Sequence, residues 1–240
     1  MAAAFFWGAL GASALLIGAM IAYRFAPGRR FIAIVMALGS GLLIGSVAFE
    51  LVDEAVKTQT VAWVGLGVLV GAATFTVGDW LLDRRGAAER KDPTGAQAEG
   101  SAQAIVLGSI LDGIPESFVL GLTVLQGGVS VSLLAGVVLS NLPEGMSSSS
   151  GLKAAGWPER RVDLMWLAVV AASALSAALG FVLLDPASGL TGAIVQAFAA
   201  GALLAMVAVT LLPEAYEVEG VFTGSLVAVG FAVSIALSAI

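Results

Sequence analysis

Two short stretches of the sequence place acidic residues beside a proline within apolar surroundings. On a helix, side chains four positions apart share one face, so the oxygen-bearing groups of each stretch would point in one direction. Carboxylate, amide and hydroxyl oxygens are the ligands that hard divalent cations prefer. The two stretches are SILDGIPESFVLG, which holds Asp112, Pro115 and Glu116, and VVLSNLPEGMSSS, which holds Ser140, Asn141, Pro143 and Glu144.

The composition predicts a membrane protein. Hydrophobic residues make up 59% of the 240 residues and charged residues 12%, whereas soluble domains hold about 25% charged residues. The mean hydropathy is +0.99. The chain has no Cys and no His, which excludes disulfides and thiolate or imidazole metal ligands. The net charge of −6 gives no indication of nucleic-acid binding.

About 20 apolar residues are needed for a helix to cross a bilayer, and the sequence holds eight such stretches. We therefore expect an all-α polytopic membrane protein in which residues 1–240 form a single transmembrane domain. The first stretch lacks a basic leader, so we interpret it as a true span and not as a signal peptide. The expected helices lie near residues 4–23, 31–52, 61–82, 103–125, 129–151, 162–184, 191–212 and 221–240.

Basic residues predict the orientation, because Lys and Arg in short loops are retained on the cytoplasmic side. Only Lys57 lies in an even-numbered connection. We therefore expect both termini outside the cytoplasm, a location in the cell (inner) membrane, and a polar cytoplasmic loop at residues 83–101 between the third and fourth helices. The basic residues of the odd-numbered connections are Arg24, Arg29, Arg30, Arg84, Arg85, Arg90, Lys91, Lys153, Arg160 and Arg161.

Two segments indicate an internal repeat. ALGSGLLIGSVAFELVDEA (Ala37–Ala55) aligns without a gap with AFAAGALLAMVAVTLLPEA (Ala197–Ala215), and both end in Leu-x-x-Glu-Ala. By the predicted topology these segments run in opposite directions, as in inverted-repeat transporters. We expect a 3+2+3 arrangement in which helices 1–3 and 6–8 are related and surround a central pair, helices 4 and 5. The alternative is that Ala, Gly, Leu and Val recur by chance in any membrane helix.

The fourth and fifth expected helices contain prolines and carboxylates that are unfavourable within a membrane-spanning helix. Helices four and five are joined by only Gln126–Gly128, so we expect them to be antiparallel neighbours. Pro115 and Pro143 are expected to interrupt their helices and to free the carbonyl oxygens of Leu111 and Leu139. A carboxylate at the bilayer centre costs about 2.5–3.5 kcal/mol, and no Lys or Arg lies deep in any expected span. A bound cation, bound protons or a water-filled cavity would offset this cost, unless the acids lie near helix ends and face water.

The paired Pro-Glu motifs on consecutive helices, the eight expected spans, the long third connection and the LLPEA ending of the seventh helix resemble the ZIP family of divalent metal transporters, in its bacterial GufA-like branch. The resemblance covers essentially the whole chain. In that family the fourth helix usually reads His-Asn-x-Pro-Glu-Gly and the fifth carries a similar motif, and these side chains build a metal site, often binuclear, in the transport path. The resemblance implies metal ligands at Asp112, Glu116, Ser140, Asn141 and Glu144.

The chain departs from the family pattern at several of these places. Asp112 and Ser140 stand where histidine is usual, although glutamine also occurs at the second place; Gly113 replaces the usual Asn, and Ser117 replaces the Gly that closes the first motif. The sixth helix has no acid within Val169–Gly180. We therefore expect one metal site with oxygen ligands only. The expected substrate is a divalent metal ion, Zn²⁺, Fe²⁺, Mn²⁺, Mg²⁺ or Ca²⁺, and an oxygen-only site favours the harder ions over Zn²⁺.

Two further acidic groups lie near helix ends. The first, at the outer end of the second helix, is either an entrance funnel for cations or a solvated helix end. The second lies where the seventh helix reaches the cytoplasm and is a candidate exit or regulatory cation patch. The entrance group is Glu50, Asp53 and Glu54, and the exit group is Glu214, Glu217 and Glu219. The run Ser147–Ser150 is interpreted as a surface for close helix contact in preference to a hydroxyl-lined path.

No enzyme is expected, because the chain lacks His, Cys and a phosphate-binding glycine loop. The expected function is transport of divalent metal cations into the cytoplasm through a single oxygen-ligand site between helices four and five. The alternative is a proton-linked or metal-insensitive membrane protein on the same scaffold, whose intramembrane carboxylates titrate and do not bind metal. The expected partners are the metal ion and the lipid bilayer, with a homodimer on family grounds only and no nucleic acid.

Overall fold

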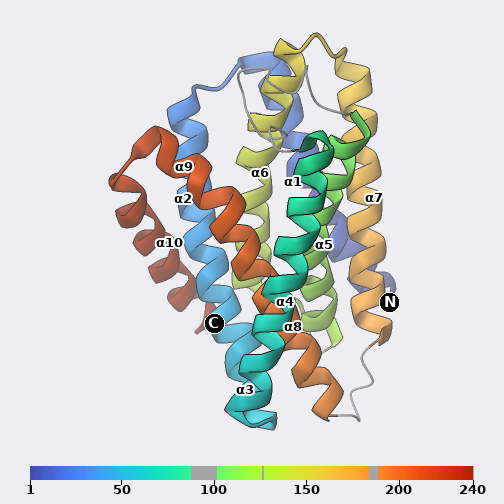
Figure 1. The fold of residues 1–240 in the computed structure, drawn as a ribbon, viewed down its shortest axis with the longest axis vertical. Helices are drawn as coiled ribbons and strands as arrows, with labels where there is room; N and C mark the ends of the chain where they lie inside the picture. Colours follow the sequence, from blue (N-terminus) through green and yellow to red (C-terminus); the bar gives the residue numbers. More distant parts are fainter. Residues whose placement is uncertain (88–101, 126, 184–188, 240) are drawn as a thin grey trace.

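The computed structural model describes residues 1–87, 102–125, 127–183 and 189–239, and every regular element within these ranges is helical (Figure 1). The predicted all-α fold is therefore confirmed. Residues 88–101 of the predicted cytoplasmic loop lie outside the described residues. The elements are α1 (Ala2–Phe25), α2 (Arg29–Ser46), η1 (Val47–Val52), α3 (Asp53–Thr58), α4 (Val61–Leu82), η2 (Asp83–Ala87), α5 (Ala102–Leu125), α6 (Val131–Ala154), α7 (Glu159–Leu183), α8 (Gly189–Met206), η4 (Val207–Leu211), α9 (Leu212–Glu219) and α10 (Phe222–Ser238).

Six helical stretches are long and apolar enough to cross a membrane. α10 is apolar but shorter, and α6 is not among the six. Many large apolar side chains are exposed, including Trp63, Leu69 and Val77 on α4, as expected where lipid and not water is the solvent. The chain is a polytopic membrane protein, and the count of eight spans stays a prediction. The six stretches are Ala2–Phe25, Arg29–Thr58, Val61–Ala87, Val106–Leu125, Glu159–Val182 and Gly192–Glu219.

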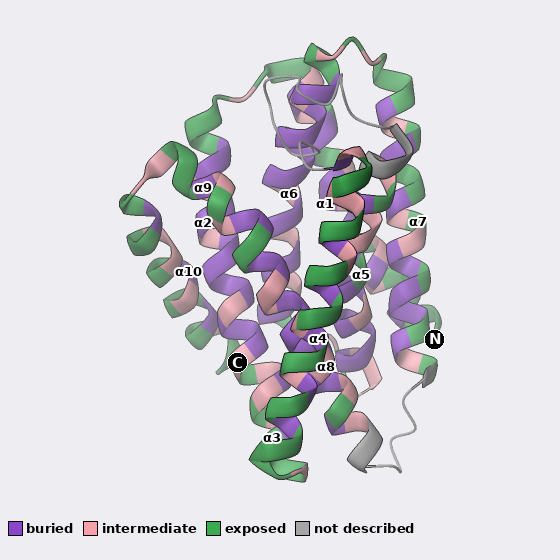
Figure 2. Cartoon of the chain, viewed as in Figure 1, coloured by how far each residue is buried: buried purple, intermediate pink, exposed green. Residues whose placement is uncertain are grey.

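The helices form two packed groups. In the first, α1 packs along α6 and α7, and α7 packs along α5; in the second, α4 packs along α8 and α2 along α10. The main contact between the groups is made by α2 and α6. Helices α5 and α6, predicted to be neighbours, approach each other closely at only a few positions. Figure 2 shows that α4 exposes much of its surface while α6 is mostly buried.

Close contacts between glycines and carbonyl groups hold the second group together, and the same contacts occur in the pair α2 and α10 and in the pair α4 and α8. A Cβ added to Gly41 on α2 would strike the Val227 carbonyl on α10, and a Cβ added to Gly201 on α8 would strike the Val68 carbonyl on α4. Gly41 and Gly201 occupy equivalent places in the aligned segments Ala37–Ala55 and Ala197–Ala215. The reciprocal contacts also occur in both pairs: Gly230 lies against the Leu38 carbonyl, and Gly71 lies against the Phe198 carbonyl.

The first group has the same kind of paired contacts. Gly18 and Gly145 join α1 to α6, and Gly121 and Gly180 join α5 to α7, each glycine lying against a carbonyl of the facing helix. Gly145 directly follows the Pro-Glu of the second motif, but its counterpart Gly121 lies one turn beyond Ser117. The close approach on α5 is therefore displaced by one turn, which explains why the first motif can end in a serine.

The second and seventh predicted helices each contain a π-helical segment in which the hydrogen bonding widens. In the first it is η1, between α2 and α3, and in the second it is η4, between α8 and α9. Both segments begin at equivalent places in the alignment, at Val47 and Val207. Each π segment changes the direction in which the acidic residues beyond it face relative to the residues before it.

A buried chain of three hydroxyls links the two groups. The Ser132 Oγ on α6 lies 2.8 Å from the Ser46 Oγ on α2 and 2.9 Å from the Ser234 Oγ on α10. All three side chains are buried, and interhelical hydroxyl bonds stabilise membrane helix pairs by about 0.6 kcal/mol each on average. These bonds reinforce the contact of α6 with α2 and α10.

The connections that hold most basic residues lie at one end of the bundle. The turns from α1 to α2 and from α6 to α7 meet there, while the two chain termini lie toward the other end (Figure 1). We call the end of the bundle at which these two turns meet the basic end. It is defined by Arg29, Arg30, Lys153, Arg160 and Arg161.

Candidate metal site

The first contact of the candidate site joins the two Pro-Glu motifs. The Ser140 Oγ on α6 lies 2.9 Å from the Glu116 Oε1 on α5 and 3.0 Å from the Val137 carbonyl oxygen of its own helix. A hydroxyl that donates to a carboxylate forms a stronger bond than one between neutral groups. The structure therefore brings together one predicted ligand from each helix.

The five predicted ligands are all buried. None of them exposes more than 3% of its surface, and two of the five are four positions apart on α5 while two more are four apart on α6. Buried carboxylates are unfavourable unless a proton, a cation or hydrogen bonds compensate them. The five are Asp112, Glu116, Ser140, Asn141 and Glu144.

Asn141 is positioned by the first helix. Its Nδ2 donates to the Gly11 carbonyl oxygen on α1 at 3.3 Å. This bond uses only the amide nitrogen of Asn141. A cation would bind the other amide atom, the Oδ1, which takes no part in this bond. The sequence reasoning missed Gly11; the glycines on α1, at Gly8, Gly11 and Gly18, were the available signal because they let other helices approach the α1 backbone.

The expected helix interruption does not occur. Pro115 lies inside the continuous helix α5 and Pro143 inside the continuous helix α6. The Leu139 carbonyl, which Pro143 cannot bond, faces α2: a Cβ at Gly39 would lie 2.7 Å from its oxygen. Packing of neighbouring helices can accommodate a proline within a membrane helix. This oxygen therefore packs against α2 at Gly39.

The charge of the site has no basic partner within α5, which has no Lys or Arg, and α6 holds only Lys153. The Lys153 Nζ donates to the Tyr23 carbonyl oxygen at 2.8 Å and lies 5.3 Å from the centre of the Tyr23 ring. Within the described residues, no three carboxylates gather closely enough to hold a metal ion by themselves. A metal site in this arrangement therefore needs the hydroxyl and amide oxygens of Ser140 and Asn141 as well.

The predicted entrance acids border a pocket of about 550 Å³ between η1, α3 and the end of α10. Lys57 also borders it, and its Nζ lies 2.8 Å from Asp53 Oδ2 and 3.3 Å from Glu54 Oε2. Gly39 on α2 packs beside Ser140 of the candidate site. Glu50 lies about 16 Å further along the same helical stretch, at 1.5 Å per residue. The entrance group is thus separate from the candidate site, and its negative charge is partly neutralised.

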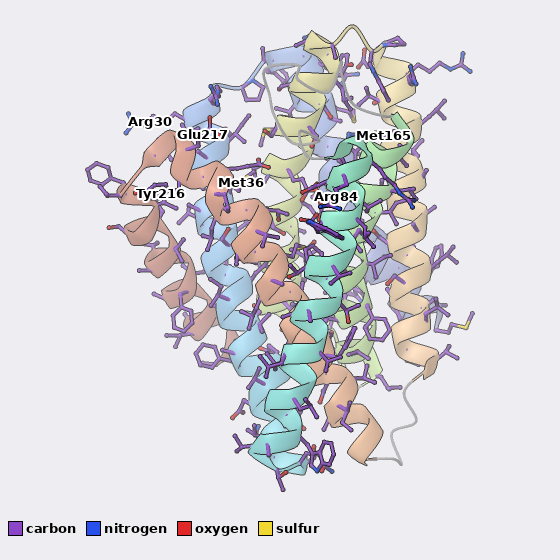
Figure 3. All side chains as sticks on the ribbon, viewed as in Figure 1. Arg30, Met36, Arg84, Met165, Tyr216 and Glu217 are labelled. Atoms are coloured by element: carbon purple, nitrogen blue, oxygen red, sulfur yellow. The ribbon has the colours of Figure 1, made fainter. Side chains whose placement is uncertain are left out.

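The predicted exit acids lie at the basic end. Glu217 Oε1 is 3.3 Å from Arg29 Nη2, and Glu219 Oε1 is 2.9 Å from Arg30 Nε; Figure 3 shows Arg30 and Glu217 at the same corner of the bundle. The third exit residue, Glu214, lies in the first turn of the same short helix α9. The connection that holds these acids has no basic residue of its own, but the fold supplies Arg29 and Arg30 from the start of α2.

Similarity to known families was found in one comparison. The model of the ZIP zinc transporter family matches residues 82–238, a range that contains both Pro-Glu motifs and the exit acids. A search of curated proteins gave no significant match.

Proposed function

Because the chain belongs to the ZIP zinc transporter family, we propose that it carries divalent metal cations into the cytoplasm through the site between α5 and α6. Members of this family are membrane transporters of divalent metals and not enzymes. The observation that carries the assignment of the site is the buried contact of Glu116 with Ser140, because it joins the two Pro-Glu motifs at the centre of the bundle. The proposed ligands are Asp112, Glu116, Ser140, Asn141 and Glu144.

The oxygen-only ligand set supports a hard divalent ion as the preferred substrate. Zn²⁺ sites usually include histidine or cysteine, and this chain has neither. Mn²⁺, Mg²⁺, Ca²⁺ and Fe²⁺ accept carboxylate, amide and hydroxyl oxygens. We expect Mn²⁺ or Fe²⁺ to bind more tightly than Mg²⁺ or Ca²⁺, following the order of affinities for one site.

The proposed architecture has eight spans in a 3+2+3 arrangement, with both termini outside the cytoplasm and the basic end inside. The equivalent glycine contacts of Gly41 and Gly201 and the matching start points of η1 and η4 support an inverted repeat. Alternating access would then follow from movement of the group α1, α5, α6 and α7 against the other group. The entrance acids would gather cations on the outer side, and the exit acids would contact them on the inner side. A homodimer is proposed on family grounds.

Metal-dependent stabilisation of the purified protein tests the site. A ligand at 100 times its dissociation constant stabilises the native state by about 2.7 kcal/mol. We expect Mn²⁺ or Fe²⁺ to raise the melting temperature of the wild type and not that of Glu116→Gln or Glu144→Gln. Glu159→Gln is the matched control, because Glu159 is exposed at the start of α7 and belongs to none of the proposed cation sites, so this variant should keep the full shift. An equal shift in all four proteins would place the metal elsewhere.

Uptake into proteoliposomes tests transport itself. We expect the wild type to take up metal at fixed pH with a saturable dependence on metal concentration. The second candidate is a proton-linked protein whose carboxylates titrate, and the observation that favours it is the lack of three clustered carboxylates among the described residues. Uptake or binding that depends on pH alone, with no response to any metal, would establish this alternative.

A further inference from the structure

Ser148 on α6 has a buried hydroxyl without a hydrogen-bond partner among the residues that the structure describes. The residue exposes 1% of its surface, and its Oγ is fully enclosed. Hydroxyls inside helices usually donate to the carbonyl four residues earlier, as Ser40, Ser46 and Thr210 do here. Ser148 does not make this bond, and burying a donor without a partner is unfavourable. The hydroxyl is thus available to a group that the described part of the protein does not supply.

The position of Ser148 connects it to the candidate site. Ser140, Glu144 and Ser148 are each four residues apart on the continuous helix α6, so they lie on one face at intervals of about 6 Å. The first of them contacts Glu116 on α5. Ser147 and Ser148, three and four residues beyond Glu144, are therefore the next polar side chains on this face in the direction of the basic end. Of these two, it is the Ser148 Oγ that has no hydrogen-bond partner among the described residues.

The carboxylates of helix α5 fix the height of Ser148 relative to the candidate site. It runs antiparallel to α6 (Figure 1), and the contact of Glu116 with Ser140 fixes their relative height. One turn further toward the basic end on both helices, Asp112 lies level with Glu144. One turn beyond that, the residue of α5 at the height of Ser148 is Gly108, by the same count along each helix. The level of the carboxylates Asp112 and Glu144 is therefore followed, toward the basic end, by a level at which α6 carries the Ser148 hydroxyl.

We propose that Ser148 is a transient oxygen ligand for the transported cation on its way from the carboxylates to the basic end. The inference rests on the proposed function and adds a second, weaker binding position to the same path. A neutral hydroxyl binds a divalent cation less strongly than a carboxylate, and transport requires sites weak enough to release the ion. A hydroxyl one turn beyond Glu144 meets this requirement. Ser148 therefore differs from the rest of the run Ser147–Ser150, for which close packing was expected.

A cysteine scan of two adjacent serines tests the proposal, because the chain contains no cysteine. Ser148→Cys would place a soft thiolate ligand in the path. Ser149→Cys is the matched control, since Ser149 is equally buried but its Oγ accepts a hydrogen bond from Trp166 Nε1 at 2.8 Å. We expect Mn²⁺ uptake by Ser148→Cys in proteoliposomes to be inhibited at Cd²⁺ concentrations about tenfold below those needed for the wild type or Ser149→Cys, because thiolates prefer soft cations.

The outcomes separate this proposal from the proposed function. If Ser148→Cys and Ser149→Cys transport Mn²⁺ with the same Cd²⁺ sensitivity as the wild type, Ser148 is a packing residue and the proposal is wrong, while the transport function stands. If the wild type shows neither uptake of nor stabilisation by any metal, the proposed function fails and the proposal fails with it.

Ser148→Cys could also lose activity through misfolding, so a second measurement uses the purified variant without transport. A small charged thiol reagent should modify the introduced thiol at position 148 and not the one at position 149, and Mn²⁺ should slow that reaction at least about twofold if half or more of the sites are occupied by the ion. Modification that Mn²⁺ does not slow, or no modification at all, would overturn the proposal.

Discussion

Substitution of the equivalent glycines Gly41 and Gly201 tests the packing of the second helix group most directly. A Cβ would lie 2.8 Å from the Val227 carbonyl carbon at Gly41, and 2.7 Å from the Val68 carbonyl carbon at Gly201, whereas ordinary contact begins at 3.4 Å. The carbonyl oxygens lie closer still, so each helix pair must separate by about 1 Å or more to admit a methyl group, and a gap of about 0.5–1 Å already removes a quarter to a half of the dispersion energy of the atoms concerned. We expect Gly41→Ala and Gly201→Ala each to cost about 1–3 kcal/mol, the range for overpacked cores.

The free energy of unfolding, measured by titration with SDS in mixed micelles, checks this expectation. Gly65→Ala and Gly224→Ala are the controls, because both glycines lie within helices and have nothing within 4 Å of an added Cβ. Without a collision, alanine should be neutral or stabilise the helix by up to about 1 kcal/mol. The reasoning is refuted if Gly41→Ala and Gly201→Ala are as stable as the controls. It is also refuted if the two differ by more than about 1.5 kcal/mol, half of the upper overpacking cost, since equivalent contacts should respond alike.

Three further predictions concern single polar contacts. Ser140→Ala should destabilise the protein by about 1.5–3 kcal/mol, because it removes a hydrogen bond to the buried Glu116 carboxylate, and Ser140→Thr should recover most of the loss in the same SDS titration. Arg30→Gln should cost about 1 kcal/mol in low salt, because it leaves Glu219, whose side chain is only 5% exposed, without its partner, and 1 M NaCl should abolish the difference in melting temperature. Lys57→Gln should lower the apparent KM for metal uptake about twofold at low ionic strength by making the entrance pocket more negative, and an unchanged KM would show that cations enter elsewhere.

The sequence predicted the helical class and the membrane environment because both depend on composition and on runs of apolar residues. It did not predict the π segments, although the aligned segments Ala37–Ala55 and Ala197–Ala215 contain both η1 and η4. Hydropathy could not give the helix ends either. The second helix continues to Thr58 through η1 and α3, past the expected end at residue 52, because acidic residues at the end of a helix need not interrupt its backbone bonds.

The candidate site was predictable only in its residue types. Spacing on α5 and α6 placed Asp112 with Glu116 and Ser140 with Glu144, but the contact between Ser140 and Glu116 depends on how far apart the two helices lie. The prolines were misjudged for a related reason. A proline removes one hydrogen bond, yet Pro143 remains within a continuous helix whose backbone packs closely against Gly39 of α2. Such compensation comes from a residue far away in sequence, so local pattern alone could not indicate it.

The polarity of α6 has a consequence for biosynthesis. This helix carries the serine run, Asn141 and Glu144, and it is not among the stretches apolar enough to cross a membrane on their own. Its polar face is stable in a bilayer only beside other helices, and its main neighbours, α1 and α2, precede it in the chain. The ribosome therefore delivers α6 after the two helices that shelter it. A circular permutant that begins at α6 and ends with α5 keeps every contact of the folded bundle but reverses this order, and its α6 should fail to insert until α1 and α2 arrive.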